Sequence, residues 1–204
     1  MRLKIWEIAL IVALAAALLG GTALAREQTE LASKLIRLHV VPNSDAKEDQ
    51  ELKIAVRDTV LDVTQPLLKG VASREKARAV LEKNLDAIAA AAEKTIRKAG
   101  FAYPVRVGLE TESLPTRRYE TFALPAGEYL TLRVTIGEGS GGNWWCVIYP
   151  PLCMTAAQAE EAFADLTEEE VRLITEDSPP YVVKFKVIEI IQSIREYLEE
   201  KGIL

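Results

Sequence analysis

The sequence predicts a single domain of the α+β class with a mostly antiparallel sheet. An alternating apolar pattern over residues 36–41 predicts a first strand, and two long amphipathic helical patterns follow it, to about residues 66 and 99. Several strand patterns come next, between residues 103 and 149, and a helical pattern over 185–198 closes the chain. Strands and helices that are grouped in this way, rather than strictly alternating, are typical of α+β folds.

Composition limits the possible functions. The chain has 204 residues, which is enough for one hydrophobic core, and its apolar and charged fractions are those of a globular protein. The formal net charge is -5. A surface that binds nucleic acid needs an excess of positive charge, so DNA and RNA are not expected as partners.

Residues 1–25 have the features of a secretory signal peptide. Basic residues come first, residues 8–19 are an unbroken apolar run, and small residues precede a cleavage site after Ala25. The run is short for a membrane span, which needs about 20 residues, although residues 20–25 could extend it into an uncleaved anchor. Both readings make residues 26–204 a single exported domain, whose membrane contact is limited to an uncleaved N-terminal segment.

The first strand has one buried face, because its apolar residues recur at every second position. Pro42 ends this strand, since proline cannot donate to a ladder. Ser44 or Asp45 is expected to cap the first helix, with Glu48 completing a capping box. The buried stripe of that helix is expected at Leu52, Val56, Val60 and Val63, with Asp49, Lys53 and Arg57 elsewhere.

The second helix is expected to start after an N-cap at Ser73 and to end before a C-terminal cap at Gly100. Its apolar stripe consists of Leu81, Leu85, Ile88, Ala92 and Ile96.

Four strand patterns follow, over residues 105–109, 117–123, 129–136 and 144–149. The last two flank a glycine-rich loop, residues 137–143, and therefore predict a hairpin.

His39 is the only histidine in the chain and would attract any search for a catalytic base or a metal ligand. A base must reach a nucleophile, and a zinc site needs about three or four ligands. No cluster at ligand spacing accompanies His39, so we expect no metal and no cofactor. We interpret it as a strand residue bonded to the following turn or to the acidic start of the helix.

Two motif matches have simpler explanations. Residues 137–142 fit GxGxxG, but that pattern binds a pyrophosphate only where it opens a helix, and here a strand follows. Residues 73–76 fit SxxK, but no Lys-Thr-Gly strand accompanies them, and Ser73 is explained as a helix cap.

Cys146 and Cys153 are the only cysteines. In an exported protein two nearby cysteines predict a disulfide, here closing a small loop. Two separate structural thiols, or a thiol nucleophile paired with His39, are the alternatives. The neighbouring Trp144 and Trp145 must face opposite sides of a strand, so one of them lies either under a second covering layer or in an exposed contact surface.

Three stretches resemble the stage II sporulation protein R family of endospore-forming Firmicutes. They are LIRLHVVPNSDAKEDQELKIAVRD from residue 35, LPAGEYLTLRVTIGEGSGGNWWCVIYPPLC from residue 124, and YVVKFKVIEIIQSIRE from residue 181. The tandem tryptophans with two cysteines and a double proline, and the segment HVVPNSD, carry most of the resemblance.

The resemblance implies a signalling protein and not an enzyme. Such proteins are made in the forespore and exported into the space between the forespore and mother-cell membranes. There they activate a membrane-embedded aspartic protease, stage II sporulation protein GA, which processes the precursor of mother-cell sigma factor E. We expect the contact surface for that protease at the turn and the hairpin, comprising His39, Asn43, Ser44, Asp45, Asn143, Trp144 and Trp145.

Two other functions remain open from the sequence. An exported cell-wall hydrolase or thiol enzyme would use His39 with Cys146 or with acidic residues in one cleft. A wall- or sugar-binding module would use the aromatic residues of the hairpin.

Overall fold

The structure is a computed structural model, and it describes residues 29–119 and 123–151. After a helical segment over residues 29–34, its elements are β1 (Ile36–Val41), α2 (Lys47–Leu68), α3 (Arg74–Lys98), β2 (Val105–Leu114), β3 (Arg117–Arg118), β4 (Ala123–Leu124), β5 (Gly127–Ile136) and β6 (Trp144–Tyr149). The predicted α+β class is confirmed. The predicted signal peptide with its cleavage site after Ala25, Cys153 and the C-terminal helix lie outside the described residues.

The main sheet has four strands in the order β2-β5-β1-β6. β2 pairs antiparallel with β5, β1 pairs parallel with β5, and β1 pairs antiparallel with β6. The sheet is therefore mostly antiparallel, as predicted.

The predicted hairpin between β5 and β6 is wrong, because β1 lies between these two strands. The connecting loop must cross two strand spacings, about 10 Å, and its seven residues can reach about twice that far. Glycine-rich loops of this length fit a hairpin and a crossing over one strand equally well. The sequence pattern therefore could not distinguish them.

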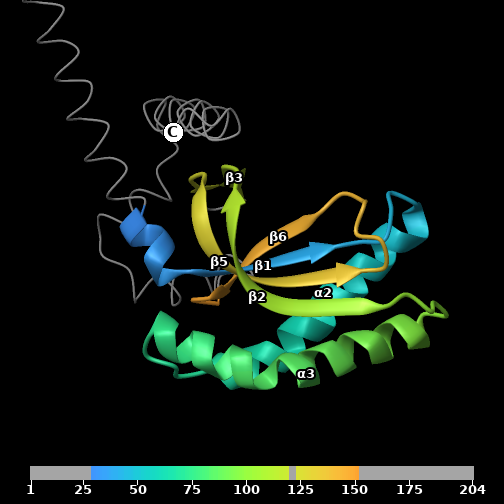
Figure 1. Cartoon of the computed structure of the whole chain (residues 1–204), viewed down its shortest axis with the longest axis horizontal. Coiled ribbons are helices and arrows are strands. Elements are labelled where there is room, and N and C mark those ends of the chain that lie inside the picture. Colours follow the sequence, from blue (N-terminus) through green and yellow to red (C-terminus); the bar gives the residue numbers. More distant parts are fainter. Residues whose placement is uncertain (1–28, 120–122, 152–204) are drawn as a thin grey trace, which may run out of the picture.

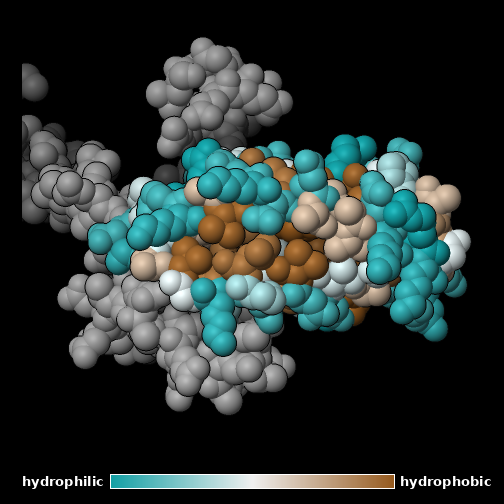
Figure 2. Space-filling model, turned by 90° about the horizontal axis from the view of Figure 1, so that it is seen from below, coloured by the Kyte–Doolittle hydropathy of each residue, from teal (hydrophilic) through white to brown (hydrophobic). Residues whose placement is uncertain are grey.

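Helices α2 and α3 cover one face of the sheet as a second layer (Figure 1). The main core lies between the two layers and is built from Leu38, Val40, Leu52, Val56, Val60, Leu81, Ile88, Ile96, Leu132, Val134 and Ile136, among others. In Figure 2, which views the molecule from below, apolar surface gathers near the middle and hydrophilic residues surround it. Among the described residues, no helix combines the length and the apolar character that crossing a membrane requires.

Helix α2 differs from the prediction at its start. Its N-cap is Ala46, which makes no side-chain capping bond. Asp49 and Lys53 are buried on the same stripe as Leu52 and Val56, whereas Val63 is only partly buried. The apolar pattern missed the two charged residues because it takes no account of polar partners. Asp49 accepts from Asn43 and Ser44 in the turn just before the helix. Lys53 donates to Gly142, 89 residues away.

Helix α3 agrees with the prediction at both ends. The Ser73 hydroxyl accepts a hydrogen bond from the Lys76 N–H at 3.3 Å, and Gly100 follows the helix with φ +88. The next predicted strand, residues 117–123, is instead two short strands, because β3 and β4 pair antiparallel with each other.

The second face of the sheet carries a smaller apolar cluster beside polar strand residues. The cluster comprises Leu31, Ala32, Leu35, Leu114, Leu124, Tyr129 and Val147, with Trp145 packed against it. Arg37 is fully buried on this face, where its Nε donates to the Cys146 carbonyl at 3.2 Å and its Nη2 donates to the Tyr119 hydroxyl at 3.0 Å.

Candidate functional site

The two loops that carry the most distinctive sequence lie against each other at one end of the sheet. Because β1 and β5 run parallel in register, with Val41 opposite Thr135, both strands end at the same edge. The turn after β1 (residues 42–46) therefore meets the loop after β5 (residues 137–143). We call these two segments together the loop corner.

Asn43 joins the two segments. Its Nδ2 donates to Asp49 Oδ2 at 2.9 Å, and its Oδ1 accepts from the backbone N–H of Glu138 at 3.0 Å. Its carbonyl accepts from the Ser140 hydroxyl at 2.7 Å. One side chain thus connects the turn, the start of α2 and the opposite loop.

Asp49 is the buried acceptor beneath the turn. Its Oδ2 also accepts from the Ser44 hydroxyl at 2.6 Å. Burial alone would raise the pKa of Asp49, but hydrogen bonds from Ser44, Asn43 and Tyr103 outweigh burial, and the pKa is lowered. A charged, fully bonded carboxylate therefore holds the turn in place.

A second set of contacts joins Asp45 and α2 to Gly142. Asp45 Oδ1 accepts from the Gly142 N–H at 2.6 Å, and Lys53 Nζ donates to the Gly142 carbonyl at 2.7 Å. Lys53 also donates to Gln50 Oε1 at 2.6 Å. Burial lowers the pKa of Lys53, although the charge of Asp45 acts in the opposite direction.

The loop glycines allow this close approach. A Cβ at Gly137 would collide with the Asn43 side chain, and one at Gly141 would collide with the Ser44 carbonyl. Gly137 also has φ +58, a conformation that other residues rarely adopt. The GxGxxG match therefore reflects loop packing, and here it leads into a strand and not into a phosphate-binding helix.

Several side chains of the loop corner are exposed, whereas its partly buried polar groups are hydrogen-bonded within the chain. Asp45, Glu138, Ser140 and Asn143 are exposed, whereas Asn43 and Ser44 are partly buried. Four residues of the predicted contact surface, Asn43, Ser44, Asp45 and Asn143, thus lie in the two segments, and Trp144 directly follows one of them. They differ in what they can present to a partner.

His39 lies in the middle of β1, opposite Trp145 of β6, and is 4% exposed. Its Nδ1 is 2.9 Å from Glu112 Oε2, and its ring stacks on Trp145 with centroids 3.7 Å apart. The predicted partner in the following turn or helix is therefore wrong. Glu112 comes from β2 and is 73 residues away in the sequence, so no local spacing could reveal it.

Glu112 is shared between two basic groups. Arg133 Nη1 donates to its Oε1 at 2.8 Å. Burial would raise the pKa of Glu112, but His39 and Arg133 outweigh this effect, and the pKa is lowered. The strand alternation that places Glu110 and Glu112 on one face of β2 was the only available sequence signal for this cluster.

Trp144 and Trp145 face opposite sides of β6, as predicted. The Arg57 guanidinium lies 4.4 Å from the centroid of the Trp144 ring, and that of Arg117 lies 5.5 Å from the Trp145 ring. Both tryptophans are partly buried, and within the described residues neither indole N–H has a hydrogen-bond partner. Cys146, which follows the two tryptophans, is buried, and its predicted disulfide to Cys153 stays a prediction.

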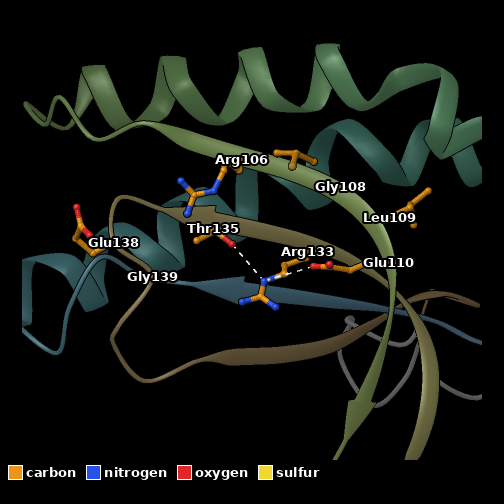
Figure 3. Close-up of a pocket in the computed structure, with 9 residues that line it drawn as sticks. Arg106, Gly108, Leu109, Glu110, Arg133, Thr135, Glu138 and Gly139 are labelled. Carbon is orange, nitrogen blue, oxygen red and sulfur yellow. Dashed lines mark hydrogen bonds and ion pairs between the residues drawn. The ribbon is translucent and has the colours of Figure 1, made fainter.

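An open depression of about 420 Å³ adjoins the loop corner on the second face of the sheet (Figure 3). Gly108 and several charged residues line it. Arg133 contacts Glu110 at 3.5 Å and donates to the Thr135 hydroxyl at 3.3 Å. Among the described residues, no three His, Cys, Asp or Glu side chains are grouped as a metal site would require. The depression is polar and mixed in charge, which suits contact with a polar surface.

Comparison with known proteins gives one family and one relative. The family model described as stage II sporulation protein R matches residues 32–159. A protein from Bacillus subtilis (strain 168) named "Stage II sporulation protein R" is 38% identical over 135 residues, which is 66% of this chain and 60% of that relative. The chain thus spans less than two thirds of the relative's length. No solved structure matches.

Proposed function

Because the chain belongs to the stage II sporulation protein R family, we propose that it is an exported signal between the two compartments of a sporulating cell. Family membership gives it a role in sporulation. In the proposal, the chain reaches the space between the forespore and mother-cell membranes and activates a membrane-embedded aspartic protease of the stage II sporulation protein GA type. That protease then processes the precursor of mother-cell sigma factor E.

The observation that carries the proposal is the loop corner. Two stretches that are distinctive in the sequence, residues 42–46 and 137–143, form one surface whose interior hydrogen bonds are made within the chain. A surface that is already ordered loses little conformational entropy on binding, which favours affinity. This arrangement supports recognition of a partner protein.

The predicted contact residues fall into three roles in this proposal. Asp45 and Asn143 are exposed and can reach the protease. Asn43 and Ser44 hold the turn through Asp49. His39 is buried and acts through the position of Trp145, on which it stacks.

Activation adds a requirement beyond binding. A ligand shifts a protease toward its active state only as far as it binds that state more tightly. Direct binding between the exported chain and the protease should therefore be measurable.

The test is a binding titration with the detergent-solubilised protease and the full chain. Asn143→Ala should weaken binding at least about fivefold, as expected for one interface side chain worth about 1 kcal/mol. Its control is Arg97→Ala, an exposed residue on α3 whose guanidinium pairs, among the described residues, with Glu93. Absence of binding by the unmodified chain, or equal binding by Asn143→Ala, would count against the loop corner as the contact surface.

One observation favours an enzyme as the second candidate. A carboxylate on Nδ1 of a histidine, as in the His39–Glu112 pair, is an arrangement that orients a general base. However, Nε2 of His39 is buried and has no hydrogen-bond partner among the described residues. Hydrolysis of purified cell wall by the parent chain, abolished in His39→Gln, would favour the enzyme. Under our proposal neither the parent chain nor the variant hydrolyses cell wall.

A further inference from the structure

β2 is an edge strand with one described neighbour, β5. It is ten residues long and so leaves a long row of backbone groups on its outer side. Figure 1 shows β2 at the border of the sheet, above α3. Proteins usually protect such an edge, because it can pair with another chain.

The direction of the outer backbone groups follows from one hydrogen bond. The Gly137 N–H donates to the Pro104 carbonyl at 2.8 Å, so residue 104 and every second residue after it direct their backbone groups toward β5. The groups of Val105, Val107, Leu109 and Thr111 therefore point outward. The side chains of Val105, Val107 and Leu109 are only partly buried against the core.

Contacts within the described residues do not explain why residue 108 is a glycine. A Cβ added there would meet nothing within 4 Å. Glycine weakens a strand interior and often marks a place where another backbone approaches closely. Gly108 lies at the centre of the exposed part of β2, between Arg106 and Glu110 (Figure 3).

The sequence around Gly108 is complementary to a second copy of itself that runs antiparallel. Reversing residues 105–111 about Gly108 places Arg106 opposite Glu110, Val107 opposite Leu109, and Val105 opposite Thr111. The first pair is oppositely charged, the second is apolar and the third is β-branched, which are favourable cross-strand pairs. Arg106 and Glu110 are both exposed. Arg106 forms no ion pair with a described residue, and Glu110 contacts Arg133 through one carboxylate oxygen, Oε1, at 3.5 Å.

We propose that β2 pairs with β2 of a second copy of this chain, antiparallel, about a two-fold axis at Gly108. The pairing joins the two four-stranded sheets into one sheet of eight. The outward backbone groups of Val107 exchange hydrogen bonds with those of the partner copy's Leu109. The two copies of Gly108 then form a non-hydrogen-bonded pair, the kind in which the Cα atoms of antiparallel strands lie closest together. Two symmetric Arg106–Glu110 pairs flank the axis.

Other registers are less favourable. An axis at Arg106 or at Glu110 would place like charges directly opposite each other, which is destabilising. An axis at Leu109 would require Glu112 as the partner of Arg106, but the Glu112 side chain is 10% exposed and already bonded to His39 and Arg133. Complementarity of β2 with itself favours a second copy over an unrelated partner.

A cysteine at the axis tests the register directly. In Gly108→Cys the two cysteines would face each other at a Cα separation of about 4.5 Å, within the range for a disulfide. We expect mild oxidation of the full chain in gentle detergent to give a covalent dimer on a non-reducing gel. Glu110→Cys is the matched control, because its two copies would lie about 13 Å apart along the strands. Equal cross-linking of both variants, or none of Gly108→Cys, would overturn the proposed register.

Charge reversal tests the pairing without a cross-link. Sedimentation of the full chain should show a dimer, and Arg106→Glu should raise its dissociation constant about tenfold, because two attractive pairs become repulsive. The double variant Arg106→Glu/Glu110→Arg should restore the dimer, which a folding defect would not do. Arg97→Glu, on the exposed side of α3, should have no effect. A monomeric parent chain, or a double variant as weak as the single one, would contradict the proposal; protease activation is measured separately and does not depend on it.

Discussion

The carboxamide of Asn43 accepts a hydrogen bond from the backbone of Glu138, 95 residues further along the chain. This contact forms only because β1 is inserted between β5 and β6 and runs parallel to β5. A simple hairpin of β5 and β6 would have kept the two loops apart. The topology of the sheet thus creates the loop corner.

Asn43→Ala should destabilise the fold by about 1 to 3 kcal/mol, because it leaves buried Asp49 with one donor fewer and frees the Glu138 N–H. Urea denaturation measures the change. Asn143→Ala is the control: its side chain is exposed, so its free energy of unfolding should stay within about 0.5 kcal/mol. Similar losses in both variants would contradict the role given to Asn43.

Gly141→Ala and Gly142→Ala form a matched pair in the same loop. The new Cβ at residue 141 would collide with the Ser44 carbonyl, whereas the one at residue 142 would sit 3.4 Å from Asp45 Oδ1. We expect Gly141→Ala to cost about 1 to 3 kcal/mol and Gly142→Ala to cost clearly less. Thermal unfolding of the two variants side by side decides this, and the reverse order would show that the loops are not held as described.

The stability of the fold should depend on pH through Asp49 and Glu112. Both pKa values are lowered in the folded state, so near pH 4 the unfolded chain binds more protons than the folded one. This stability is fully present above the unfolded values, about 3.9 for Asp and 4.3 for Glu. It is lost as the pH falls through the folded values.

Urea denaturation at several pH values between about 6 and 3 measures this dependence. The double variant Asp49→Asn/Glu112→Gln, which cannot titrate at either position, should have a lower stability at pH 6 and a flatter profile. A profile as steep as that of the parent would assign the acid sensitivity to other carboxylates.

The sequence also predicts a disulfide between Cys146 and Cys153. Thiol titration of the denatured, unreduced exported protein should then find no free thiol, and reduction should lower stability by about 2 to 3 kcal/mol. Two free thiols per chain would contradict the bridge.

Local patterns were sufficient for most elements of the fold. The two-residue alternation of Ile36, Leu38 and Val40 identified β1, and the caps at Ser73 and Gly100 defined α3. These features depend on near neighbours in the chain. The α+β class followed from their order.

Contacts between distant segments could not be predicted in this way. Lys53 was expected away from the buried stripe of α2, but it donates to Gly142, 89 residues away in a loop whose position depends on strand order. Asp49 has near partners, Asn43 and Ser44, but apolar periodicity alone does not identify a buried carboxylate. His39 was expected to bond the following turn or the acidic start of the helix, but it bonds Glu112, 73 residues away on β2, which only the pairing of the sheet brings near it. The two loops were identified from the sequence, while the bonds that join them were not.

The central claim is that the exported chain activates a membrane-embedded aspartic protease, and cleavage of the precursor of sigma factor E measures it most directly. Protease and precursor would be co-expressed with the full chain, with the chain lacking residues 1–25, or without it. We predict that the precursor is cleaved only when the full chain is co-expressed, because only that form should reach the far side of the membrane. Cleavage that is equally strong without the chain, or that is absent although the chain is exported, would contradict the account.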